Sequence, residues 1–138
     1  MSSGVTVNPD SVAQFQDLKL KKKHKYIIFG LNEDKTEIIV LKSSTSKDYE
    51  EFLVDLPENQ CRWAVYDLEF LKEEGGLRNK IIFYHWSPEG AKIKDKMVAA
   101  SSREALRRAL VGIAVEIQGT EDSEVALETV LEKAKRGN

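Results

Sequence analysis

The strongest structural signal in the chain is the segment KIIFYHW at residues 80–86. A short run rich in β-branched and aromatic residues indicates a strand buried in the core of a sheet. Outward from this segment, weaker strand patterns occur at residues 26–31, 36–41, 62–70 and 113–118. The polar stretch between the first two of these is typical of a hairpin turn. We therefore expect a sheet of about five strands.

Helical patterns precede, separate and follow these strands. Asn8 followed by Pro9 predicts a helix start, because Asn8 can cap the helix and Pro9 fits its first position. Apolar residues at helical spacing predict further helices at residues 48–56, 93–110 and 127–134. Since some strands form hairpins and others are separated by helices, the pattern favours an α/β (α+β) domain. Its central mixed sheet should be flanked by helices on both faces.

The helical region that begins near Ile93 contains an internal start signal. Ser101 and Glu104 have the spacing of a capping box, in which the first side chain caps a new helix. This spacing predicts that the helix is kinked, or that a second helix begins, at Ser101. The region is expected to end at Gly112.

Length and composition restrict the class of protein. The chain has 138 residues, of which 41% are hydrophobic and 32% are charged, and its formal net charge is −2. These values argue against a disordered chain, a membrane protein and a nucleic-acid-binding domain. We expect residues 1–138 to form one domain, with residues 1–6 as a flexible N-terminal tail. With one cysteine, Cys61, and no secretory signal pattern, the chain is expected to lack disulfides and to be cytosolic.

The small net charge conceals three strongly charged segments. Residues 19–25 carry five lysines and no acid, residues 48–74 carry nine acids against two bases, and residues 92–108 carry six bases against two acids. In the last segment, lysines flank Ile93 and Met97, which lie four residues apart and would share a helix face. An apolar ridge edged by cations suits docking onto an acidic protein partner. Anionic lipid headgroups would satisfy it as well.

The sequence offers no positive argument for an enzyme. Phosphate-binding glycine loops, nucleophile-elbow motifs and metal-ligand spacings are missing, so neither a cofactor nor a metal is predicted. His24 lies within a lysine cluster, which disfavours a role as a cation ligand, and His85 is interpreted as a strand side chain. Cys61 is interpreted as a buried structural thiol.

Two stretches of the basic region also carry a family resemblance. Residues 86–97, WSPEGAKIKDKM, and residues 101–110, SSREALRRAL, resemble the long actin-binding helix region of the actin-depolymerising factor/cofilin family. Shorter segments agree in the same order along the chain, at residues 3–5, 35–38, 56–62, 66–67, 118–120 and 123–125. Together they cover nearly the whole chain, and they are most similar to fungal-type cofilins.

The resemblance implies a single actin-depolymerising-factor-homology domain and an actin-binding function. Proteins of this family bind ADP-actin monomers and filament sides, change filament twist, sever filaments and promote depolymerisation. It also implies a monomeric protein without a cofactor, located in the cytoplasm with the cortical actin cytoskeleton. Two alternatives stay open: a same-fold regulator of actin or an actin-related complex that does not sever, and a phosphoinositide-binding surface protein. The basic run Lys21 to Lys25 leaves nuclear import open as well.

The resemblance also implies which residues carry the function. Ten are assigned to the surface that contacts both monomeric and filamentous actin: Ser3, Gly4, Val5, Lys94, Lys96, Met97, Arg103, Glu104, Arg107 and Arg108. Five are assigned to a filament-specific surface: Arg78, Lys80, Glu132, Lys133 and Arg136. The arginine segment is also a candidate for phosphoinositide contact. Ser3 matches the family's regulatory phosphorylation site.

Four positions qualify these assignments. Met97 would supply an apolar contact to actin, and the alternative is that it belongs to the core. Ala99 stands where the family usually has Tyr, and Lys92 stands where Pro is common. Asp95 places an acid between two of the assigned lysines, where a small neutral residue is usual. We expect this acid to lower the local positive potential.

Overall fold

The computed structural model describes residues 4–136, which fold around one mixed β-sheet. These described residues form six strands: β1 (Thr6–Val7), β2 (Tyr26–Leu31), β3 (Glu37–Ser44), β4 (Arg62–Leu71), β5 (Leu77–Trp86) and β6 (Val115–Gly119). Their order across the sheet is β1-β3-β2-β4-β5-β6. Pairing is parallel at both edges and antiparallel between the other neighbours, which confirms the predicted mixed sheet.

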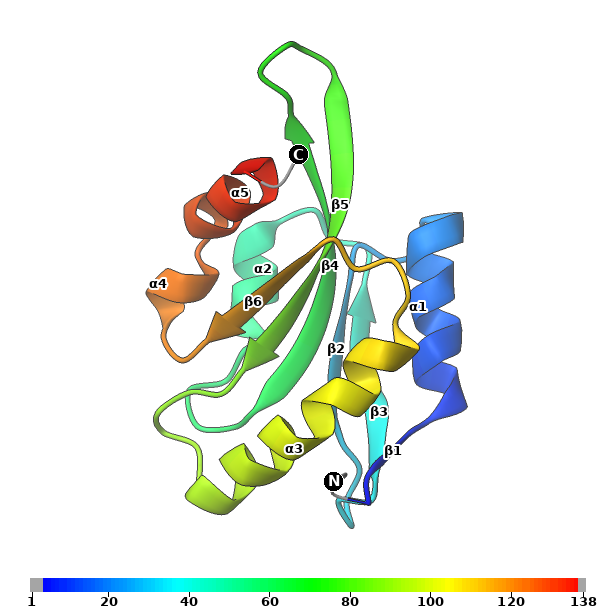
Figure 1. Cartoon of the computed structure of the whole chain (residues 1–138), viewed down its shortest axis with the longest axis vertical. Coiled ribbons are helices and arrows are strands. Elements are labelled where there is room, and N and C mark those ends of the chain that lie inside the picture. Colours follow the sequence, from blue (N-terminus) through cyan, green and yellow to red (C-terminus); the bar gives the residue numbers. More distant parts are fainter. Residues whose placement is uncertain (1–3, 137–138) are drawn as a thin grey trace.

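Helices cover both faces of the sheet, as the sequence predicted (Figure 1). They are α1 (Pro9–Lys21), α2 (Tyr49–Val54), α3 (Ile93–Ala109), α4 (Asp122–Val125) and α5 (Leu127–Arg136). α1 and α3 lie on one face, and α2, α4 and α5 lie on the other. Asn8 caps α1 as predicted, because its side-chain oxygen accepts a hydrogen bond from the N–H of Asp10 at 2.8 Å. Across residues 4–136, no helix combines the length and apolar character that a membrane crossing requires.

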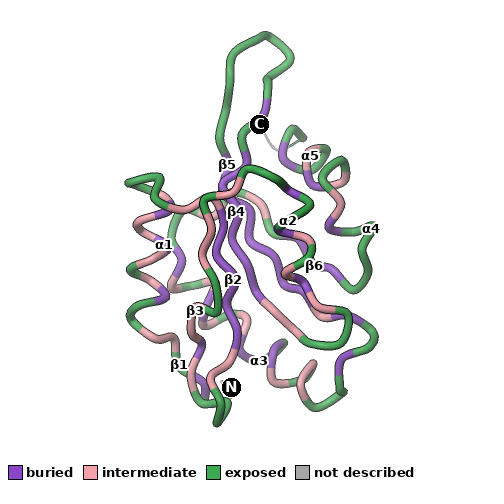
Figure 2. The backbone as a smooth tube through the Cα atoms, turned by 180° about the vertical axis from the view of Figure 1, so that it is seen from behind, coloured by how far each residue is buried: buried purple, intermediate pink, exposed green. Residues whose placement is uncertain are grey.

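β5 supplies side chains to two separate hydrophobic clusters, because successive side chains of a strand point to opposite faces. Ile82, Tyr84 and Trp86 belong to the cluster under α2, α4 and α5. Ile81 and Phe83 belong to the cluster under α1 and α3. Figure 2 shows the buried central strands that separate the two clusters. Burial on both faces explains why this segment gives such a strong signal in the sequence.

The observed sheet differs from the predicted one at an edge and at the β4–β5 hairpin. The sequence does not predict β1, because a pairing of two residues leaves no periodic pattern. β5 begins at Leu77 rather than at residue 80, since it pairs with Leu71 of β4 beyond the buried part of the sheet. Both leucines are exposed, and this end of the hairpin projects from the body as an arm (Figure 1).

α3 is one continuous helix, so the second helix predicted to begin at Ser101 is wrong, and the alternative of a kink there stays a prediction. The Ser101 hydroxyl donates a hydrogen bond to the carbonyl oxygen of Val98, 3.1 Å away within the same helix, and does not cap a new one. Ala99 and Leu106 are buried on either side of this position. One unbroken helix face therefore packs against the sheet, and this packing outweighs the local capping pattern.

The sequence predicted a flexible tail over residues 1–6, but in the structure residues 5 and 6 already belong to the folded domain. Val5 is buried, and Thr6 lies in β1, where it pairs with β3. Residues 1–3 lie outside the described residues, and the predicted phosphorylation site, Ser3, is among them.

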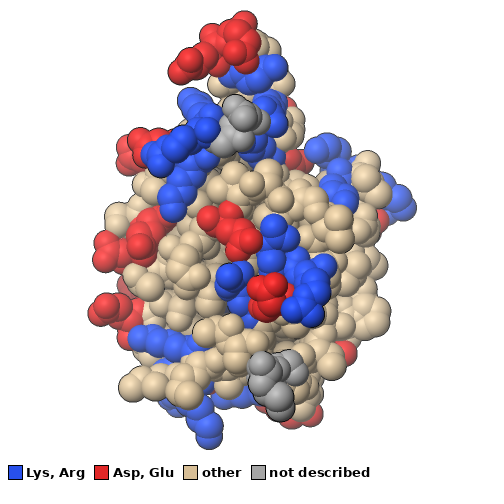
Figure 3. Space-filling view, in the orientation of Figure 1, with Lys and Arg blue, Asp and Glu red and all other residues tan. Residues whose placement is uncertain are grey.

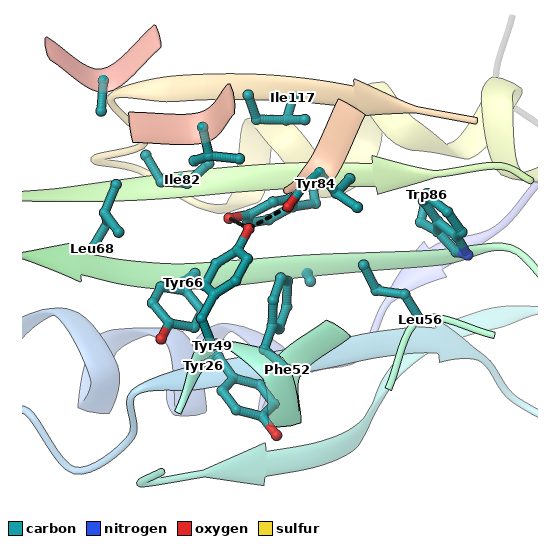
Figure 4. Packing of buried hydrophobic residues seen from close by; sticks show 14 of the residues in the cluster. Tyr26, Tyr49, Phe52, Leu56, Tyr66, Leu68, Ile82, Tyr84, Trp86 and Ile117 are labelled. Carbon is teal, nitrogen blue, oxygen red and sulfur yellow. Dashed lines mark hydrogen bonds between the residues drawn. The ribbon is translucent and has the colours of Figure 1, made fainter. Parts of the chain in front are cut away.

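A hydrogen-bonded pair of tyrosines ties β5 to the helices on one face of the sheet (Figure 4). Because a carbonyl can only accept, the Tyr49 hydroxyl of α2 donates to the backbone oxygen of Val125, 2.6 Å away. The Tyr84 hydroxyl, 2.9 Å from that of Tyr49, is then the donor of the second hydrogen bond. Burial raises the pKa of both hydroxyls, so both remain protonated donors.

Substitution Tyr49→Phe is expected to lower the free energy of unfolding by about 1–3 kcal/mol, because it leaves the buried carbonyl of Val125 without its donor. Urea denaturation measures this change. Tyr66→Phe is the matched control, since Tyr66 belongs to the same cluster and its hydroxyl is not part of the network. Equal destabilisation by the two substitutions would contradict the role assigned to Tyr49.

Candidate functional site

The N-terminal half of α3 presents an apolar ridge to the solvent. Ile93 is 76% exposed and Met97 is 66% exposed, which excludes the alternative that Met97 belongs to the core. The opposite side of the helix carries Ala99 and Leu106, which are buried against the sheet. Because its members have no role in the core, the ridge is free to contact a partner.

Two lysines edge this ridge, as the sequence predicted. Lys94 is exposed. Lys96 is half-buried, and its ammonium donates to the carbonyl oxygen of Glu89 at 3.2 Å. Lysine stems can lie along apolar surface while their charged heads stay in water, so the ridge and the cations form one surface. Figure 3 shows basic side chains over α3, with acidic ones between them.

Asp95, the unexpected acid of this region, is paired with a lysine that the sequence did not assign to the site. Its carboxylate lies 3.0 Å from the ammonium of Lys35, in the turn between β2 and β3. A cation at this distance offsets the field of the acid at longer range. The turn between β2 and β3 therefore contributes a charge to the surface around the ridge.

The C-terminal half of α3 divides its assigned charges between two roles. Arg103 and Arg107 both donate to the carboxylate of Glu116 in β6, at 2.9 and 2.6 Å, and so anchor α3 to the edge of the sheet. Arg108 and Glu104 are strongly exposed and form a loose contact of 4.0 Å along the helix. Arg108 and Glu104 are therefore the more accessible of the four residues.

A surface hollow of about 480 Å³ lies beside these arginines. Its lining combines guanidinium groups, carboxylates and apolar side chains, and includes Arg103, Arg107, Arg108, Glu104, Glu116 and Val111. The ammonium of Lys19 in α1 donates to the carbonyl oxygen of Val111 at 2.7 Å, which brings a further cation to the rim. The sequence did not assign Lys19 to this surface, because Lys19 and Val111 are 92 residues apart along the chain.

The N-terminal segment lies beside α3. β1 contacts α3, and Val5 is buried in the cluster under α1 and α3. Gly4 is exposed and has a φ of +85°, a left-handed conformation that favours glycine. The structure therefore brings two of the three assigned N-terminal residues, Gly4 and Val5, to the same side of the molecule as the ridge.

Four of the five residues assigned to the filament-specific surface are exposed where the β4–β5 arm approaches α5. Arg78 lies on the arm. Glu132, Lys133 and Arg136 lie on α5, and the guanidinium of Arg136 donates to the carboxylate of Glu132 at 2.9 Å. These residues, far apart in the sequence, thus lie on two neighbouring elements, the arm and α5.

Lys80 differs from the other members of this group, because it is buried. The residue is 6% exposed, and its ammonium donates to the backbone oxygen of Ala134 in α5 at 2.6 Å. Arg78 and Lys80 lie on the same face of β5, two residues apart, and yet only Arg78 reaches the surface. In the structure Lys80 makes an internal contact, and its assignment to the filament-specific surface stays a prediction.

A hollow of about 290 Å³ separates the arm from the end of α5. It is lined by Phe70, Lys72, Glu73, Glu74, Arg78 and Lys135. Of these, the sequence assigned Arg78 alone. The basic end of the last helix could have suggested Lys135. Phe70 and Lys72 reach the hollow only because β4 pairs with β5, which places them beside Arg78.

The two surfaces are separated by the sheet and connected by β5 (Figure 1). α3 and the N-terminal segment lie on one side, and α5 lies on the other. β5 carries Arg78 at the arm, and the chain enters α3 shortly after the opposite end of β5, at Trp86. A partner can therefore contact one surface without the other.

His85 and Cys61 have environments that suit structural roles. Burial lowers the pKa of His85, with the positive charge of Arg103 acting in the same direction, so the ring is neutral in the core. Burial also raises the pKa of Cys61. Cys61 is less buried than predicted, and its thiol lies 3.6 Å from the hydroxyl of Ser87, to which it donates.

Comparison with known sequences identifies the family. The family model described as cofilin/tropomyosin-type actin-binding protein matches residues 4–135. Cofilin of Mycosarcoma maydis is 57% identical over 136 residues, which cover 99% of this chain and 98% of that protein. Cofilin of Schizosaccharomyces pombe is 57% identical over 134 residues, which cover 97% of each chain. The chain belongs to the cofilin/actin-depolymerising-factor family of actin-binding proteins.

Solved structures agree with this family. The crystal structure of Streptomyces griseoflavus cofilin has a TM-score of 0.92 and 62% identity, and the match covers 98% of this chain and all of that one (100%). Plasmodium berghei actin depolymerization factor 2 has a TM-score of 0.86 and 30% identity, with 100% of both chains covered. The predicted resemblance and the predicted fold class are both confirmed.

Removal of the acid on the α3 surface should strengthen actin binding. Asp95→Asn leaves the Lys35 charge unopposed beside the ridge, and we expect affinity for monomeric actin to rise by up to about fivefold, the range of an exposed charge contact. Fluorescence titration at low and high salt measures the change, which should shrink as salt screens it.

The double variant Asp95→Asn with Lys35→Gln restores the local charge of the natural pair. We expect its affinity to return close to that of the unmodified protein. An unchanged affinity for Asp95→Asn at low salt would show that this pair does not face the partner.

Proposed function

We propose that this protein binds ADP-actin monomers and the sides of actin filaments, alters filament twist, severs filaments and promotes depolymerisation. The exposed ridge of Ile93 and Met97 between two lysines carries this proposal, because it is an accessible apolar surface with no role in the core. Membership of an actin-binding family supports actin as the partner.

Differential binding can perform this work without covalent catalysis or a cofactor. A protein that binds one filament twist more tightly than another shifts the bound subunits toward that twist. A boundary between decorated and bare stretches then carries a mechanical mismatch, which weakens contacts between subunits. A preference for ADP-actin has the same physical basis: the protein binds one nucleotide state of actin more tightly than another and thereby favours that state.

Each of the two surfaces has its own role in the proposal. The α3 surface, with the N-terminal segment, binds actin in both monomers and filaments. The β4–β5 arm and α5 contact a second subunit, which is present only in the filament. The separation of the two surfaces by the sheet supports this division.

Phosphorylation of Ser3 would weaken binding in this proposal. It adds about −1.5 to −2 charge units next to a surface that carries cations for an acidic partner. Exposed Gly4 and buried Val5, which bring the N-terminal segment beside α3, support the placement.

Anionic phosphoinositide headgroups are a second proposed ligand class, for the hollow beside Arg103, Arg107 and Arg108. The three arginines of this hollow and Lys19 at its rim outnumber the carboxylates Glu104 and Glu116, and this excess of positive charge favours phosphate binding. Salt-sensitive binding to phosphoinositide vesicles, lost in Arg108→Ala, would support this ligand class. Vesicle binding without filament binding would favour a lipid-binding surface protein over an actin regulator.

The proposed location is the cytoplasm, with cortical actin, and the proposed state is a monomer. Nuclear import through residues 21–25 has less support, because two of its lysines have internal partners. Lys22 pairs with Asp67 at 3.0 Å, and the ammonium of Lys25 lies 5.6 Å from the ring centre of Tyr66.

The direct test of the function combines co-sedimentation with filaments and microscopy of single filaments. We expect the protein to sediment with filaments and to produce internal breaks that shorten them. Neither binding nor shortening would contradict the proposal. Binding without breaks would favour a same-fold regulator that does not sever.

The double substitution Lys94→Ala with Lys96→Ala should remove binding to both forms of actin. We expect losses of about a hundredfold or more, equal to about 2.8 kcal/mol, because both cations edge the ridge. Titration of monomers and filaments measures this loss. Lys47→Ala, which removes an exposed lysine before α2, is the control. Unchanged monomer affinity in the double variant would exclude α3 as the binding helix.

A further inference from the structure

We propose that Lys80 is a positioning residue that fastens α5 to β5 and does not itself contact the filament. The inference rests on the proposed filament-binding function and deepens it, because it changes the role of one residue of the filament-specific surface. Its basis is the contact between Lys80 and Ala134, which are 54 residues apart in the sequence.

The acceptor of this hydrogen bond is a backbone carbonyl near the C-terminal end of α5. Ala134 lies in the last turn of α5, and no N–H group of the described residues follows it at helical hydrogen-bonding distance along the helix. Ala134 is fully buried, so water is excluded from its surroundings. A buried carbonyl requires a hydrogen-bond donor, and the ammonium of Lys80 is one such donor at 2.6 Å.

The charge of Lys80 also suits this place. A cation at the C-terminal end of a helix interacts favourably with the helix dipole and with its unpaired carbonyls. Within residues 4–136, no carboxylate forms a salt bridge with Lys80. Burial, together with the nearby charge of Arg78, lowers the pKa of Lys80. The end of α5 is therefore the partner that compensates this buried cation.

The contact connects the two parts of the filament-specific surface. Arg78 lies two residues before Lys80 on β5, and Glu132 and Arg136 flank Ala134 on α5. This hydrogen bond acts together with the packing of Val130 and Ala134 in the core to set the position of α5 relative to the arm. If the end of α5 detached, its charged side chains would lose their placement relative to Arg78.

The test compares Lys80→Met with Arg78→Met in the full-length protein. For Lys80→Met we expect amide hydrogen exchange in residues 127–136 to accelerate at least tenfold, filament affinity to fall about tenfold, and monomer affinity to stay within twofold. For Arg78→Met we expect filament affinity to fall while exchange in α5 stays unchanged.

The salt dependence of filament binding separates positioning from contact. An exposed contact charge contributes to this dependence, so Arg78→Met should reduce it. Lys80→Met should leave it unchanged, since the Lys80 charge faces Ala134. Lys80→Met could instead lower both the filament affinity and its salt dependence while amide exchange in α5 stays unchanged. This result would establish direct contact and overturn the proposal. Unchanged filament affinity in Lys80→Met would overturn it as well.

A second variant covers the case in which Lys80→Met does not fold. Lys80→Gln removes the charge and keeps an N–H donor, so the positioning role predicts that it retains more filament affinity than Lys80→Ala. Equal losses in these two variants would contradict the proposal. If the unmodified protein does not bind filaments, the proposed function fails. The exchange of α5 amides still reports whether Lys80 fastens the helix.

Discussion

The antiparallel pairing of β4 with β5 is the interaction on which the rest of the structure depends. It joins ten residues of each strand, from Arg62 with Trp86 to Leu71 with Leu77. Over most of its length the pair is buried between two layers of helices, and at one end it continues into the solvent as the arm. The same pair therefore builds both hydrophobic clusters and supports both proposed binding surfaces.

The near-neutral net charge results from segments of opposite sign, and the structure gives their charges different roles. Arg103 and Arg107 hold α3 to β6, and Lys80 holds the end of α5. Lys94 and Arg108 remain exposed for a partner. Position in the fold, and not membership of a charged segment, decides whether a basic residue stabilises the protein or is available for binding.

The sequence predicted those strands and helices whose buried faces leave a pattern of apolar residues. Residues 80–86 predicted β5 because both faces of the strand are buried, and helical spacing predicted that Met97 and Ile93 share one helix face. The arm was not predicted, since strands that pair in solvent leave no apolar pattern. The capping pattern at Ser101 does not begin a second helix, because tertiary packing outweighs local propensity. The burial of Lys80 could not be predicted, because its partner is a distant backbone carbonyl, which any residue could supply.

The central claim is that two surfaces on opposite sides of one sheet recognise two actin subunits. Hydrogen-exchange footprinting of the protein, bound in turn to monomeric actin and to filaments, tests it most directly. The account predicts protection of the exposed face of α3 in both complexes, and protection of the β4–β5 arm and α5 in the filament complex alone. Protection of the arm and α5 by monomers, or no protection of α3 by either form, would contradict it.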